Sequence, residues 1–131
     1  MENDQENIFK DAEVISVYTS EQASEDGILF DFAKNEVLRN KFFNFATTNL
    51  LYEMGILKYS AKHKKDVVNI SMMLDLIEQA KKIVLKNLEE TLNGEEHFYC
   101  GDVRKFNGER IKIFIEMNET EKFTLLLPQD H

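Results

Sequence analysis

Asp66–Asn93, DVVNISMMLDLIEQAKKIVLKNLEETLN, is the stretch that decides the fold, because its apolar residues recur at the spacing of an α-helix. One face collects the apolar side chains Met73, Leu76, Ile77, Ala80, Ile83, Val84, Leu88 and Leu92. We predict an amphipathic helix that begins between Asp66 and Ser71 and ends at Asn93-Gly94, where glycine suits the left-handed cap. Each fully buried Leu or Ile contributes about 1.5–3 kcal/mol of transfer free energy, so this helix should anchor the core.

After the helix the apolar spacing changes to two, which is typical of strands with one buried face. Three strands are expected, at His97–Lys105, Arg110–Met117 and Lys122–Leu127. Asn107-Gly108 favours the first turn because both residues tolerate positive φ, and Asn118–Thr120 forms the second. One face of this C-terminal meander carries Ile111, Ile113, Ile115, Met117, Phe123, Leu125 and Leu127. That face should lie on the helices, with the opposite face largely in water.

Before the helix, Val14–Phe32, VISVYTSEQASEDGILFDF, organises the first quarter of the chain. Its two apolar runs flank a polar insert, which predicts a strand, one short helical turn and a second strand. Thr19 or Ser20 can act as the N-cap of the turn, because a hydroxyl there accepts a bond from an unpaired N–H. Glu21 falls near the positive end of the helix dipole, and Gly27 can adopt the left-handed conformation that ends the turn.

The middle of the chain is read as a second helix and a connector. Helical spacing of apolar residues predicts a helix from about Asn44 to Met54, with Gly55 as its stop. Ile56–Lys65 is expected to be a connector that carries the one basic cluster, Lys58, Lys62, His63, Lys64 and Lys65. The expected fold is therefore α+β, with two main helices packed on a small antiparallel sheet that includes the C-terminal three-stranded meander. We expect one domain over residues 1–131, with residues 1–10 as a flexible tail.

Composition excludes several classes of function. The chain has 131 residues and a formal net charge of −8. This charge disfavours nucleic-acid binding, which draws on clustered Lys and Arg, and favours plain solubility or a protein partner with a basic surface. The single cysteine, Cys100, cannot form an intrachain disulfide, which fits a reducing compartment. The polar start and the short apolar stretches predict neither a signal peptide nor a membrane span, so a cytoplasmic location is expected.

Residues with catalytic potential are few and scattered. Cys100 and His97 are three positions apart on an expected strand and would point to opposite faces, so Cys100 is interpreted as a small core residue. Metal-binding and nucleotide-binding motifs are missing from the sequence. A divalent ion on Glu25, Asp26 and Asp31 is an alternative, but carboxylates at a turn more often cap and solubilise it. We therefore expect no enzymatic activity, no metal and no cofactor.

Both ends of the chain resemble a known family. The residues Tyr18, Thr19, Ala23, Asp26, Gly27, Leu29 and Asp31 follow the pattern Tyr-Thr-x3-Ala-x2-Asp-Gly-x-Leu-x-Asp. The closing run Leu125–Asp130, LLLPQD, completes the resemblance to an uncharacterised family of small proteins carried by phages, plasmids and other mobile elements. The chain departs from this family in having no Trp, and its middle, Lys34–Lys65, matches poorly. The resemblance implies a mobile-element context and no particular activity.

Acidic residues in the first quarter are the most conspicuous surface feature. The candidate protein-binding residues are Glu13, Glu21, Glu25, Asp26 and Asp31. They form either a solvated face or a docking face for a basic protein surface. With the resemblance, the second interpretation predicts a non-enzymatic phage or mobile-element accessory protein, an anti-CRISPR-like inhibitor of a host defence or nucleic-acid-processing protein, acting in the host cytoplasm.

Two other functions remain open. A small-ligand or nucleotide-sequestering protein would need a pocket at an oligomer interface, lined by residues such as Tyr59, Lys62, Lys65 or Arg39. The basic residues of the connector are either an anion patch or a solvated linker, and the patch would consist of Lys58, Lys62, Lys64 and Lys65. A structural or assembly protein is the other alternative. Met72 and Leu74 fall off the main apolar stripe, which would suit contact with a second copy in a homodimer.

Overall fold

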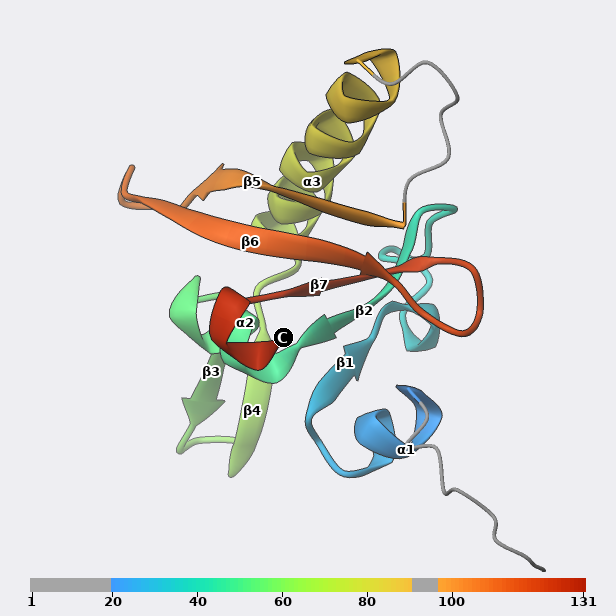
Figure 1. Ribbon diagram of the computed structural model, residues 1–131. Helices are drawn as coiled ribbons and strands as arrows, with labels where there is room; N and C mark the ends of the chain where they lie inside the picture. The colour runs from blue at the N-terminus through green and yellow to red at the C-terminus, as the bar shows by residue number, and fades with distance from the viewer. Residues whose placement is uncertain (1–19, 91–96) are drawn as a thin grey trace, which may run out of the picture.

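The computed structural model describes residues 20–90 and 97–131, and within them the chain forms an α+β fold (Figure 1). The helices are α1 (Ser20–Glu25), α2 (Thr48–Glu53) and α3 (Ile70–Glu90), with short 3-10 helices η1 (Phe32–Lys34) and η2 (Pro128–Asp130). The main sheet has the strand order β1-β2-β7-β6-β5, with bounds Leu29–Asp31, Phe43–Thr47, Phe123–Leu126, Arg110–Met117 and Phe98–Arg104. β3 (Leu57–Ser60) and β4 (Lys65–Val68) form a separate hairpin.

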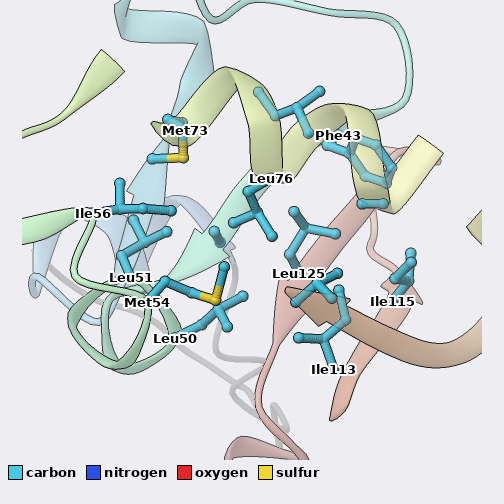
Figure 2. Packing of buried hydrophobic residues seen from close by; sticks show 14 of the residues in the cluster. Phe43, Leu50, Leu51, Met54, Ile56, Met73, Leu76, Ile113, Ile115 and Leu125 are labelled. Atoms are coloured by element: carbon cyan, nitrogen blue, oxygen red, sulfur yellow. The ribbon is translucent and has the colours of Figure 1, made fainter. Parts of the chain in front are cut away.

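The predicted helix and meander are both present. α3 starts inside the predicted window, whereas the predicted stop at Asn93-Gly94 lies outside the described residues. β5, β6 and β7 pair antiparallel in chain order, as the alternating pattern predicts. α3 crosses behind β5 and β6 in Figure 1. Figure 2 shows the core where α3, the sheet and α2 meet, with the fully buried side chains of Leu76, Ile113, Ile115 and Leu125 among its members.

Both turns of the meander fall where they were predicted, although with different backbone geometry. Gly108 takes a φ of 92°, while Asn107 keeps negative φ and accepts the N–H of Glu109 with its side chain. In the second turn the residue with positive φ is Glu121, at 67°. The first turn therefore has one residue in the left-handed conformation, in contrast to the pair expected from Asn-Gly, and the second turn also has one.

α3 approaches β5 closely because residue 101 has no side chain. A Cβ at Gly101 would lie 2.9 Å from Cδ1 of Ile83 and 3.0 Å from its Cγ1. Real Cβ atoms do not come this near to other carbons, so the contact depends on glycine at this position. The residues on either side of it that face α3, Tyr99 and Val103, are buried.

The predicted helix at Asn44–Met54 is wrong in its first half. Phe43–Thr47 forms β2, which lies between β1 and β7 and runs parallel to β7, so the sheet is mixed and not antiparallel. Aromatic and β-branched side chains favour a strand that is covered on both faces, and β2 is buried at every position except Asn44. Only Thr48–Glu53 is helical, and Thr47 caps it by accepting the N–H of Leu50.

The predicted connector at Ile56–Lys65 is also wrong. Leu57 of β3 pairs with Val68 of β4, and Lys64 takes a φ of 55° in the intervening turn. Leu57 is buried in the core, whereas the lysines of the hairpin are exposed to solvent. The segment therefore has the polar composition of a connector, although it forms a β-hairpin. Tyr52 of α2 donates a hydrogen bond to Asp66 of β4, which links the hairpin to α2 and raises the pKa of Tyr52.

The first quarter of the chain is partly described. The predicted short helical turn is α1, and Gly27 ends it with a φ of 79°. The second predicted strand is β1, which pairs antiparallel with β2. Ser20 is the first residue of α1, and its N–H and hydroxyl both donate to the carboxylate of Glu119 at 2.9 Å. The predicted first strand Val14–Tyr18, the alternative cap Thr19 and the predicted tail at residues 1–10 lie outside the described residues.

Candidate functional site

A groove of about 750 Å³ lies between α3 and the β5 end of the sheet. Its residues are Met54, Ile56, Ser71, Met72, Asp75, Gln79, Lys82, Ile83, Lys86, Asp102, Arg104, Lys105 and Phe106. We call this set the α3–β5 groove. A second hollow of about 550 Å³ continues it toward α2 and shares Met54, Ser71, Met72, Lys105 and Phe106. The two hollows are therefore neighbours, and apolar side chains stand in the walls of both.

Phe106 stands at the junction of the two hollows with 87% of its surface exposed. It lies just after β5, in the turn that leads to β6. A fully buried phenylalanine contributes about 1.5–3 kcal/mol of transfer free energy, and Phe106 forgoes most of this in the free chain. Because the turn chemistry at residues 105–108 does not require an aromatic side chain, Phe106 is available to bury itself against a bound molecule.

The groove is cationic although the chain as a whole is acidic. Its lining holds four basic side chains, Lys82, Lys86, Arg104 and Lys105, against the acidic side chains of Asp75 and Asp102. Among the described residues, no ion pair engages Lys82, Lys86 or Arg104. These three charges are therefore available to an anionic group on a bound molecule.

Lys105 has a structural role in the same groove. Its Nζ lies 3.1 Å from Oε1 of Glu109 and 3.3 Å from Oε2 of Glu53, so it joins the β5–β6 turn to α2. The hydrogen bond with Glu109, and after it that with Glu53, raises the pKa of Lys105. The same contact lowers the pKa of Glu109. Lys105 therefore holds the turn that presents Phe106 and stays protonated.

The predicted acidic docking residues are only partly assembled. Glu13 and the side chain of Glu21 lie outside the described part of the chain. Glu25 and Asp26 are exposed neighbours at the end of α1. Asp31 is half-buried and accepts the N–H of Ala33 at 2.9 Å, so it caps η1. Of the predicted acidic face, Glu25 and Asp26 are therefore the two residues that the structure describes as exposed neighbours.

The residues predicted for a ligand pocket are not among those of the α3–β5 groove. Lys62, Lys64 and Lys65 are exposed in the β3–β4 hairpin, and Lys58 borders only the smaller hollow. Nε of Arg39 donates to the carbonyl of Ala33, and the residues Tyr59, Lys62, Lys65 and Arg39 line neither hollow of the described chain. The groove residues were missed, although Lys82 and Lys86 one helical turn apart and the run Arg104-Lys105-Phe106 were visible signals.

Cys100 is exposed, so its interpretation as a core residue is wrong. The alternation along β5 turns Tyr99, Gly101 and Val103 toward α3 and Cys100 away from it. Across residues 20–90 and 97–131, no three His, Cys, Asp or Glu side chains are grouped so that they could hold a metal ion. The helices described in this range also include none with the length and apolarity needed to cross a membrane.

Comparison of the chain with models of protein families, with curated proteins and with solved structures gives no match. Function is therefore inferred from the groove itself, with its exposed aromatic side chain and with cations that form no ion pair with another described residue.

Proposed function

We propose that the chain is a non-enzymatic protein-binding module and that the α3–β5 groove is its binding site. The observation that carries the proposal is the exposure of Phe106, 87%, at a recess of about 750 Å³ whose walls include Met54, Ile56 and Met72. Interfaces gain most of their affinity from a few aromatic, methionine or arginine side chains near their centre. Phe106, Met72 and Arg104 supply this combination.

The charge distribution supports a partner that presents acidic groups to the groove. Lys82, Lys86 and Arg104 have no ion-pair partner among the described residues, although the net charge of the whole chain is −8. Glu25 and Asp26, at the end of α1, provide a second contact for a basic region of the same or another partner. The two surfaces make different predictions and can be tested separately.

The biological setting in this proposal follows from the family resemblance. The chain acts as an accessory protein of a phage or mobile element, in the host cytoplasm, and its partner is a host defence or nucleic-acid-processing protein that it inhibits. Inhibition by binding requires no catalytic residue in the groove. It requires only that the groove hold the partner strongly enough to exclude the partner's own ligand.

A double substitution in the groove, Phe106→Ala with Lys86→Glu, is expected to weaken partner binding by about tenfold or more, because it removes an aromatic anchor and reverses one charge. The measurement is recovery of the partner from host lysate on the immobilised full-length chain, followed by titration of the purified partner. Circular dichroism should show an unchanged fold, since Phe106 and Lys86 are both exposed.

The matched control for the groove variant is Glu25→Lys with Asp26→Lys, which reverses two exposed charges at the end of α1. This variant is expected to retain the partner. If it loses the partner while the groove variant keeps it, the acidic face is the binding surface and the assignment to the groove is wrong.

A second candidate function is the binding of a small anionic ligand such as a nucleotide. It is favoured by the same three cations, which form no ion pair with another described residue, beside an exposed aromatic ring on which a base can stack. Thermal-shift measurements with nucleotides separate the two functions. A rise in melting temperature that the groove variant abolishes would favour the ligand, and no rise with any nucleotide removes this candidate.

A further inference from the structure

β5 is an edge strand whose outer hydrogen-bonding side is largely open. Its partner is β6, and in an antiparallel pair alternate residues point their N–H and C=O groups toward the partner or away from it. Lys105 N donates to the carbonyl of Glu109 at 2.7 Å, and Met117 N donates to that of His97 at 2.8 Å. The odd-numbered residues of β5 therefore bond to β6. The even-numbered residues Phe98, Cys100, Asp102 and Arg104 direct their backbone groups outward.

Gln79 of α3 occupies the end of this open edge. Arg104 N donates to Oε1 of Gln79 at 2.7 Å, and Nε2 of Gln79 donates to the carbonyl of Arg104 at 3.1 Å. The side-chain amide thus makes the same pair of bonds that a neighbouring strand would make. Within the described residues, no corresponding partner satisfies the outward groups of Phe98, Cys100 and Asp102. The edge thus has one backbone-like pairing, and its next three outward positions have no partner in residues 20–90 and 97–131.

α3 places positive charge beside the open part of the edge. Gln79 contacts Arg104, and four residues later Ile83 packs against Gly101, so α3 runs antiparallel to β5. Lys82 and Lys86 continue along this direction and line the α3–β5 groove together with Asp102. A strand added to β5 would therefore turn every second side chain toward these two lysines.

We propose that the open edge of β5 binds an extended acidic segment of the partner protein as an added strand. The proposal rests on the proposed function, because it specifies how the groove holds its partner. Backbone groups of the segment pair with Phe98, Cys100 and Asp102, and its acidic side chains meet Lys82 and Lys86. This mode of recognition obtains affinity from main-chain bonds and selectivity from alternate side chains.

A second copy of the chain is a poorer occupant of the edge. Antiparallel pairing of two β5 strands follows a twofold axis perpendicular to the sheet, which puts both α3 helices on the same face. Lys82 and Lys86 of each copy would then approach those of the other, and like charges that face each other destabilise an interface. An acidic segment from another protein replaces this repulsion by attraction.

The test uses the full chain and a peptide probe of alternating glutamate and valine, acetylated and amidated at its ends. In NMR titrations the amide protons of Phe98, Cys100 and Asp102 are expected to shift downfield, while those of Tyr99 and Gly101 change little. This alternation is specific to added-strand pairing, because only the outward amides acquire a new acceptor. Equal changes along β5, or none at millimolar peptide, would overturn the proposal.

The matched pair Cys100→Pro and Cys100→Ser isolates the backbone contribution. Proline removes an N–H that β6 does not use and is tolerated on edge strands, so the fold is expected to persist. It should weaken peptide binding by about tenfold, through loss of the donor and blocking of the edge. Serine keeps the N–H and should bind like the wild type. If the two variants bind equally, strand addition is excluded.

Charge and assembly complete the test. Lys82→Glu with Lys86→Glu should abolish the preference for this peptide over one of alternating lysine and valine, whereas Lys112→Glu on β6 should preserve it.

A dimer in sedimentation velocity that Cys100→Pro dissociates would identify the occupant as a second copy and overturn the proposal. If the captured partner binds the proline variant as tightly as the wild type, the binding mode fails while the proposed function stands.

Discussion

Leu76→Ala is expected to lower the free energy of unfolding by about 2–5 kcal/mol. Leu76 lies in the first half of α3 with 0% of its surface exposed, and Figure 2 shows it near the centre of the core cluster. Truncation removes three carbon atoms from a site bounded by both helix and sheet, so neighbouring side chains can fill only part of the cavity. Urea denaturation followed by circular dichroism measures the change, and a reduced midpoint with an unchanged slope would confirm it.

Leu74→Ala is the control for that experiment, since it makes the same chemical change two positions away. Leu74 is 39% exposed, on the outer side of α3. The free energy of unfolding should fall by no more than about 1 kcal/mol in this variant, because surface substitutions create no cavity. Equal losses at the two positions would contradict the assignment of the buried face of α3.

Thr47→Val should lower the free energy of unfolding by about 2–4 kcal/mol, a large effect for an isosteric substitution. The hydroxyl of Thr47 accepts the N–H of Leu50 as the N-cap of α2. It also donates to Oδ2 of Asp130 at 2.8 Å, and the other carboxylate oxygen accepts Nδ2 of Asn49 at 2.9 Å. Valine fills the same volume but leaves a buried N–H and a carboxylate oxygen without this partner.

Thr47→Ser separates the hydroxyl from the methyl group. Serine keeps both hydrogen bonds, so the free energy of unfolding of this variant should fall by only about 1 kcal/mol, because of the missing methyl group. In thermal unfolding monitored by circular dichroism, stability is expected to decrease from the wild type to the serine variant and from the serine to the valine variant. Serine and valine variants of equal stability would show that the link between η2 and α2 contributes little.

The parts of the fold that could be predicted are those set by local periodicity. The spacing of apolar residues in α3 and the alternation in β5, β6 and β7 each require only the burial of one face, whatever lies opposite it. Gly27 and Gly108 mark ends of elements for a reason that is equally local, because positive φ is accessible to glycine without steric strain. These features are present in the structure where the pattern placed them.

Phe43–Thr47 could not be assigned from local pattern, because a continuous apolar run fits either a buried helix or a buried strand. Its strand state depends on β1 before it and on β7, which lies about 80 residues later in the chain. Thr47-Thr48 was the available local signal, since β-branched residues disfavour helix and threonine favours the cap position.

The α3–β5 groove was equally inaccessible to sequence reasoning. In the sequence pattern, Lys82 and Lys86 look like residues on the solvent-exposed face of an amphipathic helix. Arg104 looks like the last solvent-facing residue of a strand. The position of α3 beside β5 depends on tertiary contacts, since Gly101 lets Ile83 approach closely and Gln79 bonds to the strand edge. Both contacts join residues more than fifteen positions apart.

By itself, the sequence determined the α+β class, the amphipathic helix and the C-terminal meander, because one-sided burial imposes a repeat that neighbouring residues share. Tertiary structure alone decided that β2 is a central strand, that the lysine-rich run is a hairpin and that cations, an exposed phenylalanine and an open strand edge meet in one groove. Those outcomes depend on pairing between distant segments, and the free energy of such pairing is not visible in any single stretch of the chain.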